Sequence, residues 1–284
     1  MTLDRRIHAF RPDLAEASLQ GRVEAERFTE GAVAQVRVPK IALRAKPDVF
    51  CGLDTELMLG EGVKVLDVAE GWAWVKSDLD DYVGYLPQAA IIDTAPAPTH
   101  WVTVPRTFLY PEPDMKRPPV DAVSMGSRMT VTGETETRGT RYLLTTEGAV
   151  IARHLAPLGA TISDDYVDIA SLFLETPYLW GGRTGFGLDC SGLVQLAMMM
   201  AGRAVPRDSD QQAAMPGEAL TRADLARGDL VFWKGHVGVM ENRDTLLHAN
   251  GHTMSVAREK LDDAIGRIAS LYGQPTGFKR PNCK

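Results

Sequence analysis

The sequence predicts a multidomain protein in which two small all-β barrels precede an α+β domain. Residues 32–95 and 99–160 both contain short stretches of alternating apolar and polar residues, interrupted by Gly and Pro, which is typical of short strands joined by turns. After residue 160 a helical periodicity appears and strand-like runs follow it, which favours an α+β domain over residues 161–284. We expect residues 1–31 to form an arm or short helices.

The first barrel is predicted from the stretch "GVKVLDVAEGWAWVKSDLDDYVGYLP", in which apolar residues alternate with polar ones. Gly62, Gly71 and the pair Asp80-Asp81 interrupt the stretch where turns are needed. The segment "DTAPAPTHW" follows, and its two prolines predict a stiff linker.

The second barrel is predicted from "WVTVPRTFLYPEPD" and "SRMTVTGETETRGTRYLLTTEGAVIARHLAP", which are again strand-like runs separated by Gly and Pro. The two stretches also end alike, in "YVGYLPQAAI" and "GAVIARHLAP". We interpret them as a duplication of one small barrel. Such a fold does not by itself reveal a ligand.

In the third domain, Ser163 is the expected N-cap of a first helix, and a glycine-rich loop, "TPYLWGGRTGFGLD", follows that helix. A second helix is expected from Cys190 to Ala201, closed by Gly202. Two strands, "GDLVFWKGHVGVM" and "TLLHAN", flank the loop "ENRD". Residues 256–271 are expected to form another helical stretch.

Composition excludes several classes of protein. The net charge of −6 argues against nucleic acid as a partner, and no block of Lys and Arg is present. Charged residues interrupt the first twenty positions, so no apolar core of a signal peptide can be placed there. The longest apolar run, residues 193–202, is too short to span a bilayer. We therefore expect a soluble cytoplasmic protein.

The chain contains three cysteines, Cys51, Cys190 and Cys283, and no CxxC pair. An odd number without such pairs fits neither a disulfide scaffold nor a zinc knuckle. One of the three, Cys190, lies where a loop meets a predicted helix, which makes it a candidate nucleophile.

Cys190 is expected to lie at the positive end of a helix dipole, with Asp189 as the capping residue. Unpaired backbone N–H groups at this position favour a thiolate and lower the pKa of the thiol. The same groups can stabilise an oxyanion. The alternative is that Cys190 is a small apolar residue packed at the start of a helix.

A cysteine nucleophile needs a base, and His236 and His248 lie on consecutive predicted strands. If the loop between these strands contains an odd number of residues centred on Asn242, His236 faces His248 directly. His236 would then be the base and His248 would orient it. Asn250 could replace His248 in that role, and the alternative is that both histidines are structural.

A zinc site at His248 and His252 is the remaining use of these side chains. Their spacing suits a helix, but this segment is predicted as a strand, and no third ligand has a fitting position. We therefore expect no metal and no other cofactor.

The motifs "PYLWGG", "GLDCSGLVQ", "VPRDSDQQ", "GDLVFWKGHVGV" and "LLHA" occur in an order that resembles the NlpC/p60 family of bacterial cell-wall cysteine peptidases. The resemblance covers about residues 163–280 and implies a papain-like fold. It implies that Cys190 is the nucleophile, His236 the base and His248 the third member. It also implies a hydroxyl donor in the cleft at Tyr178 and binding of the substrate amine by Asp189 and Ser191, whereas Trp180 is expected to pack in the core.

The pattern "GWAWVK … DYVGYLP" resembles bacterial SH3-like barrels, and the domain order resembles the branch of the family that recycles muropeptides. In that branch the first barrel walls the cleft and recognises a free N-terminal L-alanine. A buried ammonium needs an acidic partner and acceptors. Glu61 and Tyr82 match these positions best, and Glu56 is the rival acid. The alternative is that these are solvated loop residues.

The resemblance therefore implies a cysteine endopeptidase that hydrolyses the γ-D-glutamyl-L-diamino acid bond, before diaminopimelate or lysine, in small peptidoglycan-derived peptides with a free N-terminal L-Ala. Its partner would be a small muropeptide in cell-wall recycling. Two alternatives stay open. One is a thiol-dependent acyl or amide transferase on the same core. The other is a non-catalytic protein that binds wall peptides, in which replacing Cys190 by Ala would leave binding intact.

Overall fold

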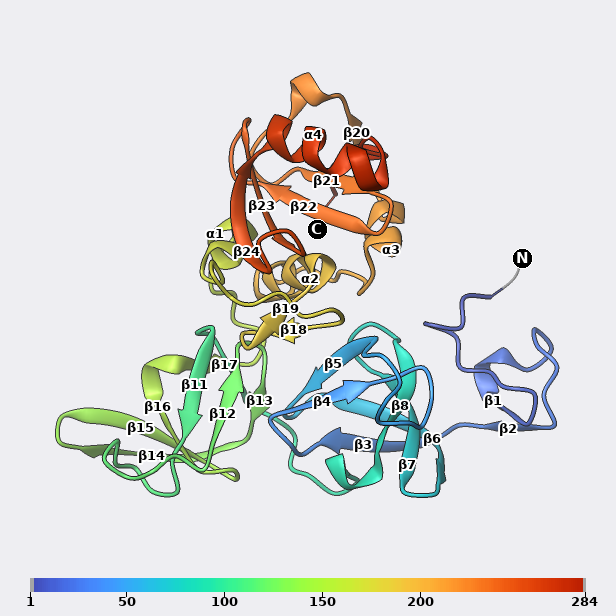
Figure 1. Ribbon diagram of the computed structural model, residues 1–284. Coiled ribbons are helices and arrows are strands. Elements are labelled where there is room, and N and C mark those ends of the chain that lie inside the picture. The colour runs from blue at the N-terminus through green and yellow to red at the C-terminus, as the bar shows by residue number, and fades with distance from the viewer. Residues whose placement is uncertain (1–2, 283–284) are drawn as a thin grey trace. The chain divides into compact units, whose positions relative to one another are not determined.

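The chain divides into two units, the first ending at Leu158 and the second beginning at Gly159 (Figure 1). The computed structural model describes residues 3–282. Within that range the first unit consists of β-strands and short 3-10 turns, whereas the second combines helices with a six-stranded sheet. The predicted order, a β-rich region followed by an α+β domain, is confirmed. None of the helices in residues 3–282 is long and apolar enough to cross a membrane.

The N-terminal segment, where an arm or short helices are expected, contains two short strands and a 3-10 turn. β1 (Leu14–Glu16) pairs in parallel with β2 (Arg27–Thr29), and the 3-10 turn η1 (Ala17–Leu19) follows β1. The buried carboxylate of Glu16 accepts hydrogen bonds from Nζ of Lys64 at 2.7 Å and from Nζ of Lys76 at 3.1 Å. These ion pairs hold the segment to the sheet that follows.

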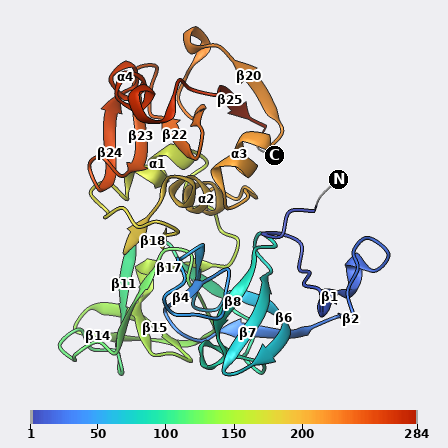
Figure 2. The ribbon, with the colours of Figure 1, turned by 45° about the vertical axis from the view of Figure 1, so that its right-hand side comes forward.

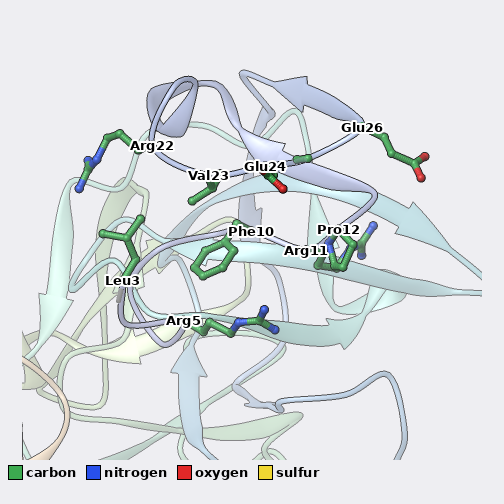
Figure 3. A pocket seen from close by; sticks show the side chains of 10 residues that line it. Leu3, Arg5, Phe10, Arg11, Pro12, Arg22, Val23, Glu24 and Glu26 are labelled. Carbon is green, nitrogen blue, oxygen red and sulfur yellow. The ribbon is translucent and has the colours of Figure 1, made fainter. Parts of the chain in front are cut away.

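A cavity of about 730 Å³ lies within the N-terminal segment (Figure 3). The guanidinium of Arg5 lies 4.7 Å from the ring centroid of Phe10 in its lining. Arg11 forms ion pairs with Asp13 at 2.7 Å and with Asp67 at 2.6 Å. The charge of Arg11 is therefore neutralised within the protein.

The first β region carries apolar side chains on both faces of its main sheet. Val63, Ala73 and Val75 are fully buried in the core on one face. On the other face, Trp74 packs with Leu14 of the N-terminal segment, so that segment covers the second apolar face of the sheet. The main sheet has the strand order β8-β7-β6-β3-β9, and β4 and β5 form a separate two-stranded sheet. The elements are β3 (Ala32–Val36), β4 (Lys40–Leu43), β5 (Thr55–Met58), β6 (Gly62–Ala69), β7 (Trp72–Ser77), β8 (Val83–Pro87), the 3-10 turn η2 (Gln88–Ala90) and β9 (Ile91–Ile92).

The second β region contains three smaller sheets, with the strand orders β13-β10-β17, β11-β12 and β14-β15-β16. Its elements are β10 (His100–Val102), β11 (Arg106–Leu109), β12 (Asp121–Ser124), β13 (Arg128–Met129), β14 (Val131–Thr137), β15 (Thr140–Thr145), β16 (Ala149–Ile151), the 3-10 turn η3 (Ala152–His154) and β17 (Leu155–Pro157).

The two β regions repeat one set of backbone hydrogen bonds. In the first region Val36 N donates to Glu61 O at 2.9 Å and Gly60 N donates to Val36 O at 2.8 Å. In the second region Val102 N donates to Ser127 O at 2.9 Å and Gly126 N to Val102 O at 3.0 Å. Both glycines have a positive φ, 77° and 88°, which residues with a Cβ rarely adopt.

The two β regions also contact each other at this turn. The side chain of Leu59 packs into the core of the second region, against Val102, Val123 and Met129. Arg128 N donates to Leu59 O at 2.7 Å, and a Cβ added to Gly60 would overlap the carbonyl oxygen of Arg128. The turn of the first region is therefore supported by the second.

The second unit is built on a sheet with the strand order β20-β25-β21-β22-β23-β24. Its elements are α1 (Tyr166–Ser171), β18 (Arg183–Thr184), β19 (Gly187–Leu188), α2 (Cys190–Met200), α3 (Ser209–Ala214), β20 (Gly217–Leu220), the 3-10 turn η4 (Arg222–Asp224), β21 (Leu230–Trp233), β22 (His236–Met240), β23 (Thr245–Asn250), β24 (Ser255–Lys260), α4 (Leu261–Tyr272) and β25 (Gly277–Pro281).

Helix α4 packs on one face of this sheet, and α2 lies against β22 and β23 (Figures 1 and 2). Met240 and Leu246 are opposite each other in the ladder and share a core with Ile268 of α4. Because side chains alternate along a strand, His236 and His248 lie on the face that Met240 and Leu246 share.

Two boundaries in this unit differ from the predictions. Residues 256–260 belong to β24 rather than to a helix, because they pair with β23. Val256 is fully buried, and α4 begins only at Leu261. Asp165, rather than Ser163, caps α1 by accepting a hydrogen bond from Val167 N at 2.9 Å. Gly202, with φ 78°, follows α2 as predicted.

Candidate active site

The N-terminus of α2 presents Cys190 as its first residue, as predicted. Oδ1 of Asp189 accepts a hydrogen bond from Gly192 N at 2.7 Å, which caps the helix. Gly192 is required here because a Cβ would overlap the carbonyl oxygen of Gly182 in the preceding loop. The loop therefore packs directly on the first turn of the helix, and it leaves Cys190 only 7% exposed.

Asp189 is bound by a buried arginine that was not among the predicted site residues. Nη1 of Arg207 donates to Oδ1 at 3.0 Å and Nη2 donates to Oδ2 at 2.6 Å. Arg207 also donates to Ser191 Oγ at 2.9 Å, and Gly181 N donates to Oδ2 of Asp189 at 2.9 Å. The motif "VPRDSDQQ" contained this residue, but it lies too far along the chain for local spacing to reveal the pair. Binding of the substrate amine by Asp189 and Ser191 stays a prediction.

The thiol of Cys190 is protonated at rest, contrary to the predicted low pKa. Burial raises the pKa of Cys190 to about 12, and the negative charge of Asp189 adds to this effect. Hydrogen bonds from the backbone N–H groups of Val237 and Ser191 act in the opposite direction but do not prevail. The prediction counted the helix dipole and omitted the loss of hydration, which is the larger effect for a buried thiol.

Cys190 is also next to the first candidate histidine, because Val237 directly follows His236 and its N–H bonds the thiol. Nε2 of His236 lies 2.9 Å from Nδ1 of His248, and the two ring centroids are 5.1 Å apart. The structure thus brings Cys190, His236 and His248 together from α2, β22 and β23.

The register of the two histidines differs from the prediction by two positions. The observed pairs are Val239 with Leu247 and Met240 with Leu246, so extending the ladder puts Gly238, rather than His236, opposite His248. Oδ1 of Asn242 accepts hydrogen bonds from Asp244 N and Thr245 N, so Asn242 starts the turn instead of forming its centre. The predicted odd loop is correct, and the histidines meet diagonally on one face.

Both histidines are neutral at neutral pH. Burial lowers the pKa of His236 to about 3, and His248 lowers it further. Burial also lowers the pKa of His248, whose side chain is fully enclosed. A neutral imidazole beside a protonated thiol can accept the proton of the thiol as it attacks a carbonyl group.

A carboxylate that was not among the predicted site residues continues this line of polar groups. Nε2 of His248 lies 3.3 Å from Oε2 of Glu259, although the two groups are not at full hydrogen-bond geometry. Nε and Nη2 of Arg267 donate to the same carboxylate at 3.0 and 2.5 Å. Because residues 256–271 were expected to form a helix, Glu259 was not predicted to lie near His248. Pairing of Leu246 with Glu259 on neighbouring strands places it there.

Asn250 does not replace His248 as the orienting residue. Its Oδ1 accepts hydrogen bonds from the backbone N–H groups of His252 at 3.0 Å and Thr253 at 2.9 Å, which shapes the turn after β23. His248, by contrast, contacts His236 directly.

Tyr178 lies half-buried in the loop before α2. Burial raises the pKa of its hydroxyl, and the nearby Cys190 and Asp189 add to that effect. Its backbone N–H donates to Met254 O at 2.8 Å. Trp180, two residues later, is 70% exposed, so its predicted place in the core is wrong. The loop packs on α2 through the backbone of Gly182, whose carbonyl oxygen faces Gly192, whereas the side chain of Trp180 lies in solvent.

Glu61 and Tyr82 belong to the first unit, and both are buried, with exposed fractions of 1% and 4%. Oε2 of Glu61 accepts a hydrogen bond from Met58 N at 2.9 Å, and Tyr82 lies in the core of the first β region. The rival acid Glu56 is also buried and accepts from Nζ of Lys40 at 2.7 Å. The alternative that these are solvated loop residues is wrong.

Among residues 3–282, no three His, Cys, Asp or Glu side chains are arranged to hold a metal ion. Cys51 is a partly exposed free thiol in the first β region. Cys283 lies outside the described residues.

Comparison with known proteins relates both units to one group of enzymes. Residues 175–267 match the model of the NlpC/P60 family, and residues 43–91 match that of the bacterial dipeptidyl-peptidase Sh3 domain. A "Probable endopeptidase NlpC" of Escherichia coli is 35% identical over 121 residues, which cover 38% of this chain and 77% of that protein.

Two further relatives extend the likeness to more of the chain. A "Gamma-D-glutamyl-L-lysine dipeptidyl-peptidase" of Bacillus cereus is 28% identical over 201 residues, which span 64% of this chain and 60% of that protein. The crystal structure of an NlpC/P60 family protein from Bacillus cereus superposes with a TM-score of 0.73 at 23% identity, over 88% of this chain and 99% of that one. The shared fold thus includes residues from both units.

Proposed function

Because the chain belongs to the NlpC/P60 family of cysteine peptidases, we propose that it hydrolyses the γ-D-glutamyl-L-diamino acid bond of small peptidoglycan-derived peptides. The observation that carries the proposal is the arrangement of a buried thiol, a neutral imidazole and a second imidazole at the N-terminus of α2. The name of the Bacillus cereus relative supports the choice of bond. The diamino acid is lysine or diaminopimelate.

The reaction begins with the uncharged thiol of Cys190 and the uncharged imidazole of His236. His236 takes the proton of the Cys190 thiol as Sγ attacks the γ-glutamyl carbonyl carbon. The C–N bond then breaks, and the proton passes from His236 to the leaving amine. Water, deprotonated by the same imidazole, hydrolyses the thioester and releases the γ-glutamyl peptide. His248 accepts a hydrogen bond from His236 and holds its ring in position through the cycle.

The negative oxygen of each tetrahedral intermediate needs donors that are already in place. Backbone N–H groups at the start of α2 provide them, and the Tyr178 hydroxyl, kept protonated by its raised pKa, is a further donor. Because donors fixed by the fold need no reorganisation during the reaction, this stabilisation is stronger than water provides.

Glu61 and Tyr82 bind the free amino group of the substrate's N-terminal L-alanine. A buried ammonium needs an acidic partner and hydrogen-bond acceptors. Glu61 is a buried carboxylate, being 1% exposed. Residues 32–95 and 99–160 form two SH3-like barrels in this proposal, and the match to the Sh3 model over residues 43–91 supports the first.

The test is to incubate the protein with L-Ala-γ-D-Glu-L-Lys, with the diaminopimelate analogue and with N-acetylated versions of both, and to follow the products by mass spectrometry. The free peptides should be cleaved and the acetylated ones should not. Cys190→Ala and His236→Ala should abolish turnover. Cleavage of none of the peptides would refute the proposed reaction, and equal cleavage of free and acetylated peptides would refute the amine recognition.

Two additions separate the alternatives. A second amine offered as an acceptor should not appear in the product, because its incorporation would indicate a transferase. Activity in the cytosolic fraction of the source cells would support the proposed role in recycling inside the cell, whereas activity confined to the medium would contradict it.

A further inference from the structure

The polar groups of the candidate site do not end at His248. The next groups are the carboxylate of Glu259 on β24 and the guanidinium of Arg267 on α4. Glu259 pairs with Leu246 in the ladder, so its side chain is on the face of the sheet that carries His248. Arg267 binds both oxygens of the carboxylate, which fixes its plane and direction.

We propose that Glu259, held by Arg267, is a positioning residue that fixes the tautomer of His248 and thereby that of His236. The inference rests on the proposed function for its effect on turnover. The tautomer itself can be measured without any substrate.

The hydrogen-bond partners of the two rings determine which nitrogen of each ring carries the proton. Nε2 of His248 faces a carboxylate and has no other hydrogen-bond partner among the described residues, so this nitrogen carries the proton. Nδ1 of the neutral His248 ring is then an acceptor. His236 must therefore donate from Nε2, because the two nitrogens are 2.9 Å apart and one must be the donor.

With its proton on Nε2, His236 has its lone pair on Nδ1. This nitrogen is therefore the one left to take the proton of the thiol. In the opposite tautomer, Nδ1 of His248 would donate to Nε2 of His236. The proton of His236 would then lie on its Nδ1, and this nitrogen could not accept the proton of the thiol.

The charges around the two rings support the same role. His236 is influenced by His248, Arg267 and Glu259, and His248 by Glu259, Arg267 and His252. Of these, Glu259 is the group that raises the pKa of either ring, and it therefore stabilises the imidazolium formed during turnover. The pairs with His248 and Arg267 lower the pKa of Glu259 to about 2, so the carboxylate stays ionised throughout the working range.

The chain offers a matched control on the same strand. Arg258 directly precedes Glu259, and its Nε and Nη2 donate to the two oxygens of Glu241, both at 2.6 Å. Both pairs are Arg–Glu forks with partly exposed side chains. Glu241→Gln removes a fork of the same kind without a contact to the histidines.

The experiment compares Glu259→Gln, Glu259→Ala and Arg267→Gln with Glu241→Gln in the full chain. Imidazole ¹⁵N chemical shifts report the tautomer of His248, thermal unfolding reports folding, and steady-state kinetics with L-Ala-γ-D-Glu-L-Lys report kcat and KM across pH. We expect the wild type to carry the His248 proton on Nε2 and Glu259→Ala to show a mixture of tautomers.

In the same variants kcat should fall by about 10- to 100-fold with KM unchanged, as is usual when a group that orients a functional histidine is removed. The acidic limb of the kcat profile should move to lower pH, because loss of the carboxylate leaves His236 with a still lower pKa. Glu241→Gln should change none of these readouts.

An unchanged His248 tautomer in folded Glu259→Ala would overturn the inference, and so would an equal fall of kcat in Glu241→Gln. If Glu259→Ala does not fold, Glu259→Gln and Arg267→Gln decide the question by the same spectra. If the wild type cleaves no peptide, the proposed function fails, whereas the tautomer measurement still tests the inference.

Discussion

The two β regions of the first unit share a turn but differ in the groups that the turn carries. Gly60 and Gly126 occupy equivalent positions with positive φ and the same backbone hydrogen bonds. The next residue is Glu61 in the first region and Ser127 in the second, and both are buried. The scaffold is therefore repeated, whereas the carboxylate is present only in the first copy.

A second difference lies in the connection that follows the longest hairpin. In the first region residues 78–82 join β7 to β8 and include Tyr82. In the second region residues 146–148 join β15 to β16, and Thr145 N closes the turn by donating to Gly148 O at 2.9 Å. The two proposed ligands of the substrate amine, Glu61 and Tyr82, thus have no counterpart at the matching positions of the second region among the described residues.

The largest expected effect comes from removing the charge that distinguishes the copies. Glu61→Gln should lower kcat/KM for the free peptide by at least about 30-fold, because loss of one partner of a buried charge pair costs about 2–5 kcal/mol. Ser127→Ala should leave kcat/KM within about twofold, since Ser127 Oγ has no hydrogen-bond partner in the described part of the chain. Steady-state kinetics of both variants checks this. Equal losses would mean that the copies do not differ in function.

A smaller effect is expected at the turn itself, and it tests whether the second region supports the first. Gly71→Ala should cost about 1–2 kcal/mol of unfolding free energy, the price of a positive φ in open space. Gly60→Ala should cost about 1–3 kcal/mol more, because its Cβ would also overlap the backbone of Arg128. Urea unfolding measures both. Equal costs would show that the contact between the regions is loose.

The smallest effect separates two buried tyrosines, one in each region. Tyr82→Phe should raise KM for the free peptide by about fivefold, the equivalent of about 1 kcal/mol for one hydrogen bond. Tyr142→Phe removes the hydroxyl that accepts from Met115 N at 2.9 Å, so it should reduce stability by a similar amount and leave KM unchanged. A KM change in Tyr142→Phe but not in Tyr82→Phe would reverse the assignment of the two regions.

Much of this organisation follows from local sequence patterns. Apolar periodicity predicts the order of the β-rich and α+β regions, and the capping pattern predicts the helix that begins at Cys190. An odd number of residues in the loop predicts that His236 and His248 share one face of the sheet. These are interactions between residues close along the chain, and they leave a direct trace in the sequence.

The rest depends on contacts between distant residues. Burial reversed the expected acidity of Cys190, and no local pattern gives the depth of a side chain. Arg207 binds Asp189 from another element, and Glu259 approaches His248 from β24, whose residues 256–260 the sequence predicts as part of a helix. The offset of two positions between the histidines depends on where Asn242 lies in its turn, which spacing alone did not determine.

The packing of Leu59 limits which parts of the first unit can be removed or exchanged. Its side chain belongs by sequence to the first β region and by packing to the interior of the second. Removal of residues 99–158 would leave that leucine in water and the carbonyl of Leu59 without its partner Arg128. The two regions are therefore not interchangeable modules: we expect them to unfold as one cooperative body, and a recombination breakpoint in the linker between them would separate a core from one of its own side chains.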